Sequence, residues 1–212
     1  MYASSAQAPA LPLADTAARI LEAARTLMTE QGLLDVSLAD ISRRAQSNVA
    51  LVSYYFGNRE GLMLALAAAD AARARIHLER LLASDFTAAE KMAMHIRGLV
   101  ETYFERPYLH RLLQKLLREG SPDVSRRIGD EFVAPVADAR RKIIEQGVDA
   151  GEFRKVDARF VSFIIDGACA HLFSSAEGRR AIIGDGLLDR ELAERHAEAV
   201  TEILLGGLHQ SA

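Results

Sequence analysis

The sequence contains one cysteine, five prolines and no tryptophan among its 212 residues. A single cysteine, Cys169, excludes an intramolecular disulfide framework and a zinc site built from several thiolates. Because proline is sparse while alanine, leucine, glutamate and arginine are abundant, the composition favours helices. Half of the residues are hydrophobic, so the chain can bury a core as one large domain or as a small domain joined to a larger one.

Long uncharged apolar runs are also missing. The longest candidates, Gly61–Ala69 and Phe160–Ile165, end at Asp70 and Asp166 and fall short of the roughly 20 residues that a bilayer requires. Residues 1–14 have neither a basic start nor a continuous apolar stretch, and we interpret them as a mobile tail and not as a signal peptide. We therefore expect a cytoplasmic protein without a membrane partner.

The sequence has no excess of positive charge. The formal net charge is −3, and the first 64 residues hold five arginines, no lysine and six acidic residues, which gives −1. A basic domain would have favoured nucleic-acid binding. Any DNA binding must therefore depend on individually placed contacts and on dimerisation, with a modest non-specific electrostatic contribution.

A helical period repeats along nearly the whole chain, and no segment shows the alternation typical of a strand. We expect an all-α fold of about nine helices. The first follows a cap at Asp15 and ends at Gly32, the second begins after Ser37, and the others span about 49–55, 59–82, 87–105, 108–118, the residues after Pro122 to 150, 157–173 and 189–208. Pro135 is expected to kink the long helix that ends near 150, and residues 178–186 are expected to form a glycine-rich loop.

The clearest local pattern is a pair of short helices joined by a turn of three or four residues, after a longer helix. This is the arrangement of a helix-turn-helix, whose second short helix enters the major groove of DNA. Within residues 49–55, Val52 falls on the same side as Phe56, and both can pack against the apolar side chains Ile20, Leu27, Leu38 and Ile41. Ala50 and Tyr54 then point the opposite way, so small and hydroxyl-bearing side chains face outward.

The order and spacing of two segments extend this pattern. The first is Gly32 followed by Val36-Ser37-Leu38-Ala39-Asp40-Ile41-Ser42-Arg43-Arg44-Ala45, and the second is Tyr54-Tyr55-Phe56-Gly57-Asn58-Arg59-Glu60-Gly61-Leu62. From about residue 15 to residue 66, about a quarter of the chain, the sequence resembles the TetR (tetracycline-repressor-like) family of transcriptional regulators. The resemblance implies an N-terminal helix-turn-helix domain (residues 15–57) and a helical ligand-sensing and dimerisation domain (residues 58–212).

The resemblance also implies DNA-contacting roles, with double-stranded operator DNA as the partner. Ser37 would offer its hydroxyl and nearby backbone N–H groups to a phosphate. Tyr54 and Tyr55 would contact phosphate and sugar, and Arg59 would pair with a phosphate. The residues expected to face base edges are Asn48, Ala50, Leu51 and Ser53, of which Leu51 can make only apolar contacts.

Three positions depart from the family pattern. Gln46 stands where the family usually has glycine in the turn, so the turn must form without the residue that most easily adopts a positive φ. Arg59 replaces the usual lysine and Ser53 a common tyrosine. These departures leave the family resemblance intact and make the operator sequence unpredictable.

The resemblance implies a homodimer that reads two half-sites and responds to a small molecule. The last two predicted helices are the expected dimer surface, with Phe160, Ile164, Gly167 and His171 on one and His196, Val200 and Ile203 on the other. Five residues of the middle helices could line an effector pocket, although each could equally belong to the core: Met92, His95, Tyr103, Phe132 and Phe163. A mostly apolar pocket would favour a hydrophobic or aromatic effector.

Other polar residues have simpler interpretations. Cys169 and His171 lie two residues apart, on different sides of a helix, so Cys169 is interpreted as a small buried side chain and not as a nucleophile. Asp166, within an apolar run, either pairs across a helix–helix interface, which we favour, or lines a cavity. His77, His95 and His110 form no metal-ligand cluster and are expected at the surface or its boundary, and no metal or cofactor is expected.

Three competing functions remain open. A regulator or nucleoid-associated protein without an inducer would bind DNA in the same way, and only an effect of a ligand on DNA affinity separates it from a repressor that a ligand releases. A helical enzyme lacks support, because the sequence has no nucleotide loop, metal cluster or paired catalytic acid and base. A protein-binding scaffold with a vestigial helix-turn-helix would not bind DNA.

Overall fold

The structure, a computed structural model, describes residues 13–32, 34–186 and 188–209. Most of the predicted tail, residues 1–12, lies outside the described residues. The chain divides into two compact units, Met1–Leu66 and Ala67–Ala212. The division falls inside a helix, eight residues beyond Asn58, and the buried Leu62 and Leu66 belong to the first unit. All regular structure in the described residues is helical, as predicted, apart from one isolated bridge between Phe153 and His209.

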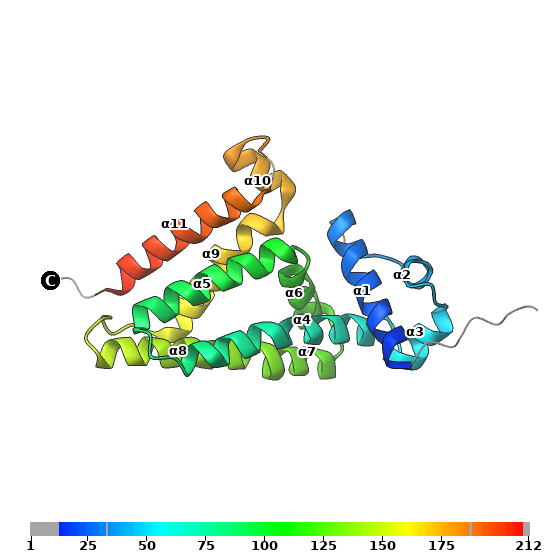
Figure 1. The fold of residues 1–212 in the computed structure, drawn as a ribbon, viewed down its shortest axis with the longest axis horizontal. Helices are drawn as coiled ribbons and strands as arrows, with labels where there is room; N and C mark the ends of the chain where they lie inside the picture. Colours follow the sequence, from blue (N-terminus) through cyan, green and yellow to red (C-terminus); the bar gives the residue numbers. More distant parts are fainter. Residues whose placement is uncertain (1–12, 33, 187, 210–212) are drawn as a thin grey trace, which may run out of the picture. The chain divides into compact units, whose positions relative to one another are not determined.

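The first unit contains α1 (Leu13–Gln31), α2 (Leu38–Arg44), α3 (Val49–Phe56) and the start of α4 (Arg59–Leu82), and the first three helices pack against one another (Figure 1). The helical period predicts one apolar stripe along α1, made of Ile20, Leu21, Ala24, Leu27 and Met28. Four of these residues are buried, and Leu21 is half-buried. The helix begins two residues before the predicted cap at Asp15, which lies in its first turn. It ends, as predicted, before Gly32, whose φ of 63° places it in the left-handed region.

The turn between α2 and α3 contains Gln46, the one non-glycine residue with a positive φ (50°) among those that the structure describes. The prediction that this turn forms without glycine is therefore confirmed, and Gln46 itself takes the strained conformation. The turn is held by hydrogen bonds from Gln46 N–H to the Arg43 carbonyl (3.2 Å) and from Ser47 N–H to the Ser42 carbonyl (2.9 Å).

Replacing Gln46 with glycine should stabilise the first unit by up to about 1 kcal/mol, because relief of the left-handed strain outweighs the extra entropy of glycine in the unfolded chain. Thermal or urea unfolding measures the change. Gln46→Ala is the matched control, since it removes the same side chain but keeps the Cβ that causes the strain. If Gln46→Ala stabilised the protein as much as Gln46→Gly, conformational strain would not be the cause.

The second unit contains the rest of α4 and the helices that follow: α5 (Ala88–Glu105), α6 (Leu109–Glu119), α7 (Pro122–Ile128), α8 (Ala134–Asp149), α9 (Ala158–Ser174), α10 (Ala176–Ile183) and α11 (Arg190–Leu208). A π-helical turn, η1 (Gly129–Val133), joins α7 to α8. In this turn the N–H of Ala134 donates to the carbonyl of Gly129, five residues earlier, directly before Pro135. The single long helix predicted after Pro122 is thus divided into α7, η1 and α8. Pro135, where a kink was predicted, directly follows the π turn and supplies no N–H to the helical ladder.

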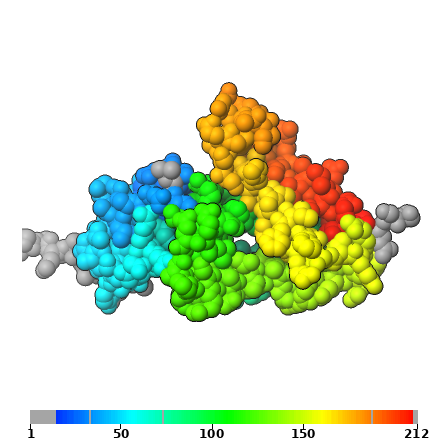
Figure 2. Space-filling model, turned by 180° about the vertical axis from the view of Figure 1, so that it is seen from behind, coloured from blue at the N-terminus to red at the C-terminus, as the bar shows by residue number. Residues whose placement is uncertain are grey.

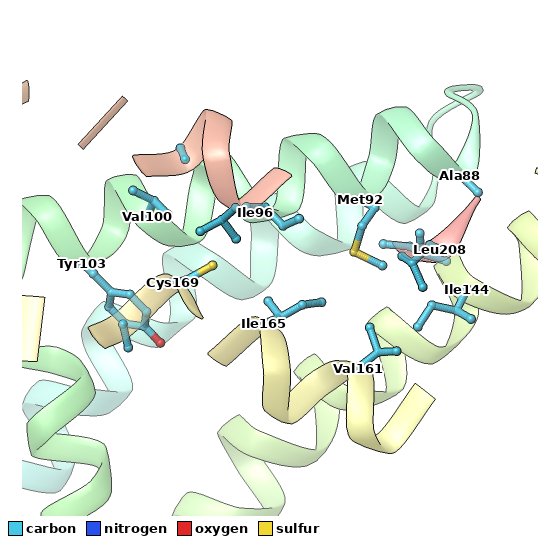
Figure 3. Close-up of a cluster of buried hydrophobic side chains, with 14 of the residues drawn as sticks. Ala88, Met92, Ile96, Val100, Tyr103, Ile144, Val161, Ile165, Cys169 and Leu208 are labelled. Atoms are coloured by element: carbon cyan, nitrogen blue, oxygen red, sulfur yellow. The ribbon is translucent and has the colours of Figure 1, made fainter. Parts of the chain in front are cut away.

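The core of the second unit lies between α5, α8, α9 and α11. In Figure 3 Met92 and Ile96 of α5 point toward Val161 and Ile165 of α9. Figure 1 shows α5 and α11 running side by side, and the buried face of α11 closes the same cluster. No helix in the described part of the chain combines the length and the apolar character needed to cross a bilayer.

The prediction of a loop over residues 178–186 is wrong for residues 178–183, which are helical. Ser175 accepts a hydrogen bond from Gly178 N–H (3.0 Å) and caps α10, which continues to Ile183 and ends at Gly184 with φ 85°. Gly178 lies inside the helix, where a glycine is tolerated, and its neighbours Arg179 to Ile183 are good or neutral helix formers. The presence of several glycines in this segment therefore predicted a longer loop than the structure contains.

Candidate DNA-binding surface and the second helical unit

The outer side of α3 is exposed, and its inner side anchors the helix to the first unit. Val52 is completely buried, whereas Ala50, Ser53 and Tyr54 are exposed and Leu51 is half-buried. Phe56, expected in the core beside Val52, is only half-buried. The predicted division of the helix is otherwise confirmed, and a face of small and hydroxyl-bearing side chains points away from the packed side.

Two predicted contact residues are helix caps. The Ser37 hydroxyl donates to the Asp40 carboxylate (2.6 Å) and accepts from Asp40 N–H (3.0 Å) at the start of α2. This bond and the ion pair with Arg43 hold the pKa of Asp40 below its usual value. Asn48 accepts a hydrogen bond from Leu51 N–H (2.9 Å) through its carbonyl oxygen, which leaves its amide NH₂ directed outward from the start of α3. Ser37 is thus engaged within the protein, whereas the amide of Asn48 can donate to DNA.

The structure separates the two adjacent tyrosines. The Tyr54 side chain is 73% exposed, and its ring packs edge-on against Tyr55 at 5.1 Å between centroids. The Tyr55 hydroxyl is buried and has no hydrogen-bond partner among the described residues. As placed, Tyr55 supports Tyr54 and does not present its hydroxyl to a phosphate, contrary to the expectation for this residue.

Arg59 is engaged at the start of α4. Its Nη2 donates to the Leu34 carbonyl (3.0 Å) and lies 3.2 Å from the Asp35 carboxylate. A phosphate contact would require Arg59 to leave this pair. A better placed cation, missed from the sequence, is Arg43, whose side chain projects from α2 with 76% exposure and pairs only on one side with Asp40. Its position at the last turn of α2, next to the turn, is the signal that could have identified it.

The five predicted pocket residues do not all lie together. Met92 and Tyr103 are packed in the core and Phe132 is half-buried in η1. Phe163 is 76% exposed on α9 and therefore does not line the interior. One shallow groove of about 460 Å³ lies between α8 and the start of α9, and it contains none of the five.

His95 is buried, and its expected place at the surface or boundary is wrong. Its Nε2 accepts a hydrogen bond from Arg140 Nε (2.9 Å), and the Arg140 guanidinium also donates to the Ser162 carbonyl (3.2 Å) and to Asp166 (2.7 Å). The predicted pairing of Asp166 across a helix interface, here between α8 and α9, is confirmed. Cys169 is buried, as predicted, and burial raises the pKa of its thiol to about 12.

Burial, with the neighbouring positive charge of Arg140, lowers the pKa of His95 to about 3. Because an unfolded histidine titrates near 6.5, the unfolded chain binds a proton between these values that the folded chain does not. Stability should therefore fall as the pH drops below 6.5, by about 2 kcal/mol between pH 7 and pH 5 for this residue alone.

Urea unfolding at pH 5, 6 and 7 measures this loss. His95→Gln, which keeps an acceptor for Arg140, should remove more than half of it. His209→Gln, at an exposed position outside the proposed dimer surface, should leave the pH dependence unchanged. An unaltered pH dependence in His95→Gln would assign the loss to other groups.

Some residues of the expected dimer surface are exposed and others are buried within the subunit. Phe160, Ile164, Gly167 and His171 lie exposed along one stripe of α9, and Phe163 adjoins them. On α11, Ile203 is 74% exposed, but Val200 is buried in the core and His196 is half-buried, bonded to the Ala168 carbonyl (2.9 Å). Val200 therefore packs within the subunit. The helical period of α11 places residues 193, 197, 200 and 208 inward and 199 and 203 outward.

The first unit is thus a helix-turn-helix domain with an open outer helix, joined by α4 to an all-helical unit. The sequence matches two family models, "Bacterial regulatory proteins, tetR family" over residues 20–66 and "Tetracyclin repressor-like, C-terminal domain" over residues 85–211. The chain belongs to the TetR family and is a DNA-binding transcriptional regulator. No curated protein matches the sequence.

Solved structures share the whole fold. A TetR/AcrR-family transcriptional regulator from Thermobifida fusca is 21% identical, with a TM-score of 0.69 over 92% of this chain and 100% of that one. The TetR-family regulator PfmR from Thermus thermophilus is also 21% identical (TM-score 0.71; 91% and 100%). The regulator FadR from Bacillus subtilis, in complex with stearoyl-CoA, is 20% identical (TM-score 0.71; 91% and 99%).

Proposed function

We propose that the protein is a homodimeric repressor that binds operator DNA through α3 and leaves it when the second unit binds a small-molecule effector. The proposal places it in the cytoplasm, with its DNA, and gives it no catalytic role. The observation that carries it is the outer side of α3, where Ala50, Ser53 and Tyr54 are exposed above the buried Val52. Such a face can approach the base edges of a major groove closely, because Ala50 and Ser53 are small.

The proposed contacts divide into two kinds. Asn48, Ala50, Leu51 and Ser53 would read base edges, while Tyr54, the backbone N–H groups at Ser37 and the exposed Arg43 would contact phosphates. Because the first unit is not basic, few counterions would be released, and operator affinity should depend only moderately on salt. Dimerisation would supply the affinity that one such helix lacks.

The exposed stripe of α9, together with Ile203 of α11, is the proposed dimer surface. Large apolar side chains on a monomer surface mark a site that another protein covers. Because α9 and α11 pack against each other within the subunit, a two-fold axis beside them would give a four-helix interface.

The proposed effector has a substantial apolar part. The interior between α5 and α9 is lined almost wholly by apolar side chains. FadR, which shares the fold and whose structure holds stearoyl-CoA, supports such a ligand. Met92 and Tyr103 would have to move aside, so the pocket would open as the ligand enters.

Selection of bound fragments from random duplex DNA, followed by a screen for metabolites that release the selected operator, tests the proposal. Tyr54→Ala should weaken operator binding about 10-fold without changing its salt dependence, because Tyr54 contributes a neutral hydrogen bond. Phe86→Ala, which also removes a large exposed side chain, is the matched control. Sequence-selective binding that no metabolite relieves would favour a regulator without an inducer, and the absence of selective binding would refute the proposal.

A further inference from the structure

The most deeply buried charge in the second unit is Arg140, on α8, with 1% of its surface exposed. Its hydrogen bonds to His95, Ser162 and Asp166 use three of its five N–H groups. His95 accepts from Arg140 and is therefore neutral at this nitrogen. The counter-charge of the buried guanidinium is thus supplied by Asp166, 2.7 Å away.

Asp166 differs from Arg140 in that 44% of its side chain is exposed. It lies on α9, and Figure 2 shows a hollow between α9 (gold) and α6 (green). The charge of Asp166 also acts on side chains of α6 and α5. Burial lowers the pKa of His110 on α6, and the charge of Asp166 opposes this shift. Burial, and then the charge of Asp166, raise the pKa of Tyr103 on α5. Asp166 therefore pairs with a buried cation while part of its own side chain is exposed to solvent.

On its inner side this ion pair borders the apolar core of the second unit. Tyr103, Ile165 and Cys169, which Figure 3 shows between α5 and α9, adjoin it on the inner side. A buried guanidinium that loses its carboxylate is left with an uncompensated charge, which another anion can neutralise. The site therefore combines an exchangeable anion position with an apolar interior.

We propose that the effector is an organic carboxylate, whose carboxylate replaces Asp166 at Nη2 of Arg140 while its apolar part enters between α6 and α9. This inference rests on the proposed effector response and names the chemical class of the ligand. A carboxylate would exchange one charge-assisted hydrogen bond for another, whereas a neutral ligand would leave the Arg140–Asp166 pair in place and gain nothing from it. The protein should therefore bind an acid more tightly than the neutral analogue of that acid.

The test measures binding of three acids, octanoate, dodecanoate and phenylacetate, each beside its primary amide, by calorimetry without DNA. At least one acid should bind the unaltered protein about 10-fold more tightly than its amide. Asp166→Asn removes the competing internal anion and should tighten acid binding about 5-fold further while leaving amide binding unchanged. Asp138→Asn is the matched control, because Asp138 is also 44% exposed and also pairs with an arginine on α8, but at the surface.

Equal binding of acids and amides, no binding of any acid to either the unaltered or the Asp166→Asn protein, or weaker acid binding in Asp166→Asn would each overturn the inference. Thermal unfolding of each unliganded variant verifies that it is folded. Release of operator DNA by a neutral compound alone would leave the proposed function intact and remove this inference. If the protein bound acids selectively but bound no DNA sequence selectively, this inference would stand and the proposed function would be refuted.

Discussion

Phe163→Glu should convert the dimer into a monomer and weaken operator binding by at least about 100-fold. The ring is 76% exposed on α9, beside Phe160 and Ile164, so it would lie near the centre of the proposed interface. Central aromatic residues contribute most to protein–protein affinity, and the two-fold axis places two glutamates in the apolar contact. Operator affinity falls as well, because two linked half-sites bind far more tightly than one.

Analytical ultracentrifugation measures the first effect and fluorescence anisotropy with operator DNA the second. Phe86→Glu introduces the same charge in place of another exposed phenylalanine, before α5, and should change neither. Ile203→Glu, on the exposed side of α11, should act in the same direction as Phe163→Glu. A Phe163→Glu protein that remained a dimer would show that the subunits meet elsewhere.

The local features of the first unit were largely predictable because each depends on neighbours in the sequence. The end of α1 at Gly32, the start of α2 at Ser37 and the buried Val52 follow from glycine position, capping residue and helical period. The contacts between side chains of separate segments in this unit could not be predicted from the sequence. The pairing of Arg59 with Asp35 and the covering of the Tyr55 hydroxyl depend on how separate segments meet.

In the second unit the helical period of α8 indicates that Arg140 is buried, although its charge suggests an exposed position. Arg140 stands beside Arg141 and Lys142, which suggests a solvated surface. Yet Val136, Ala139, Ile143 and Gly147 fall at helical spacing around it, and that stripe places Arg140 inside. Phe163 shows the reverse error: its spacing of three from Phe160 assigns it to the exposed stripe of α9, whereas its aromatic character alone suggested a pocket.

Gly147→Ala should destabilise the protein by about 3 kcal/mol, which for a chain of this size lowers the melting temperature by roughly 10 °C. A Cβ at this buried position in α8 would lie 2.2 Å from Cδ2 of the Phe153 ring. The ring is completely buried and cannot retreat. The N–H groups of Glu152 and Phe153 both donate to the Gly147 carbonyl (2.8 and 3.0 Å), and Arg154 N–H donates to the Leu208 carbonyl (2.8 Å).

Gly129→Ala is the matched control, because Gly129 has an ordinary helical φ of −57° and its added Cβ would meet no atom within 4 Å. Its stability should stay the same or rise slightly. The clash also predicts that the effects of two substitutions are not additive. Because Phe153→Leu makes space for the methyl group, Gly147→Ala should lower the stability less in a Phe153→Leu background than alone. Additive losses in this cycle would mean that Gly147 is required for a reason other than the approach of the Phe153 ring to α8.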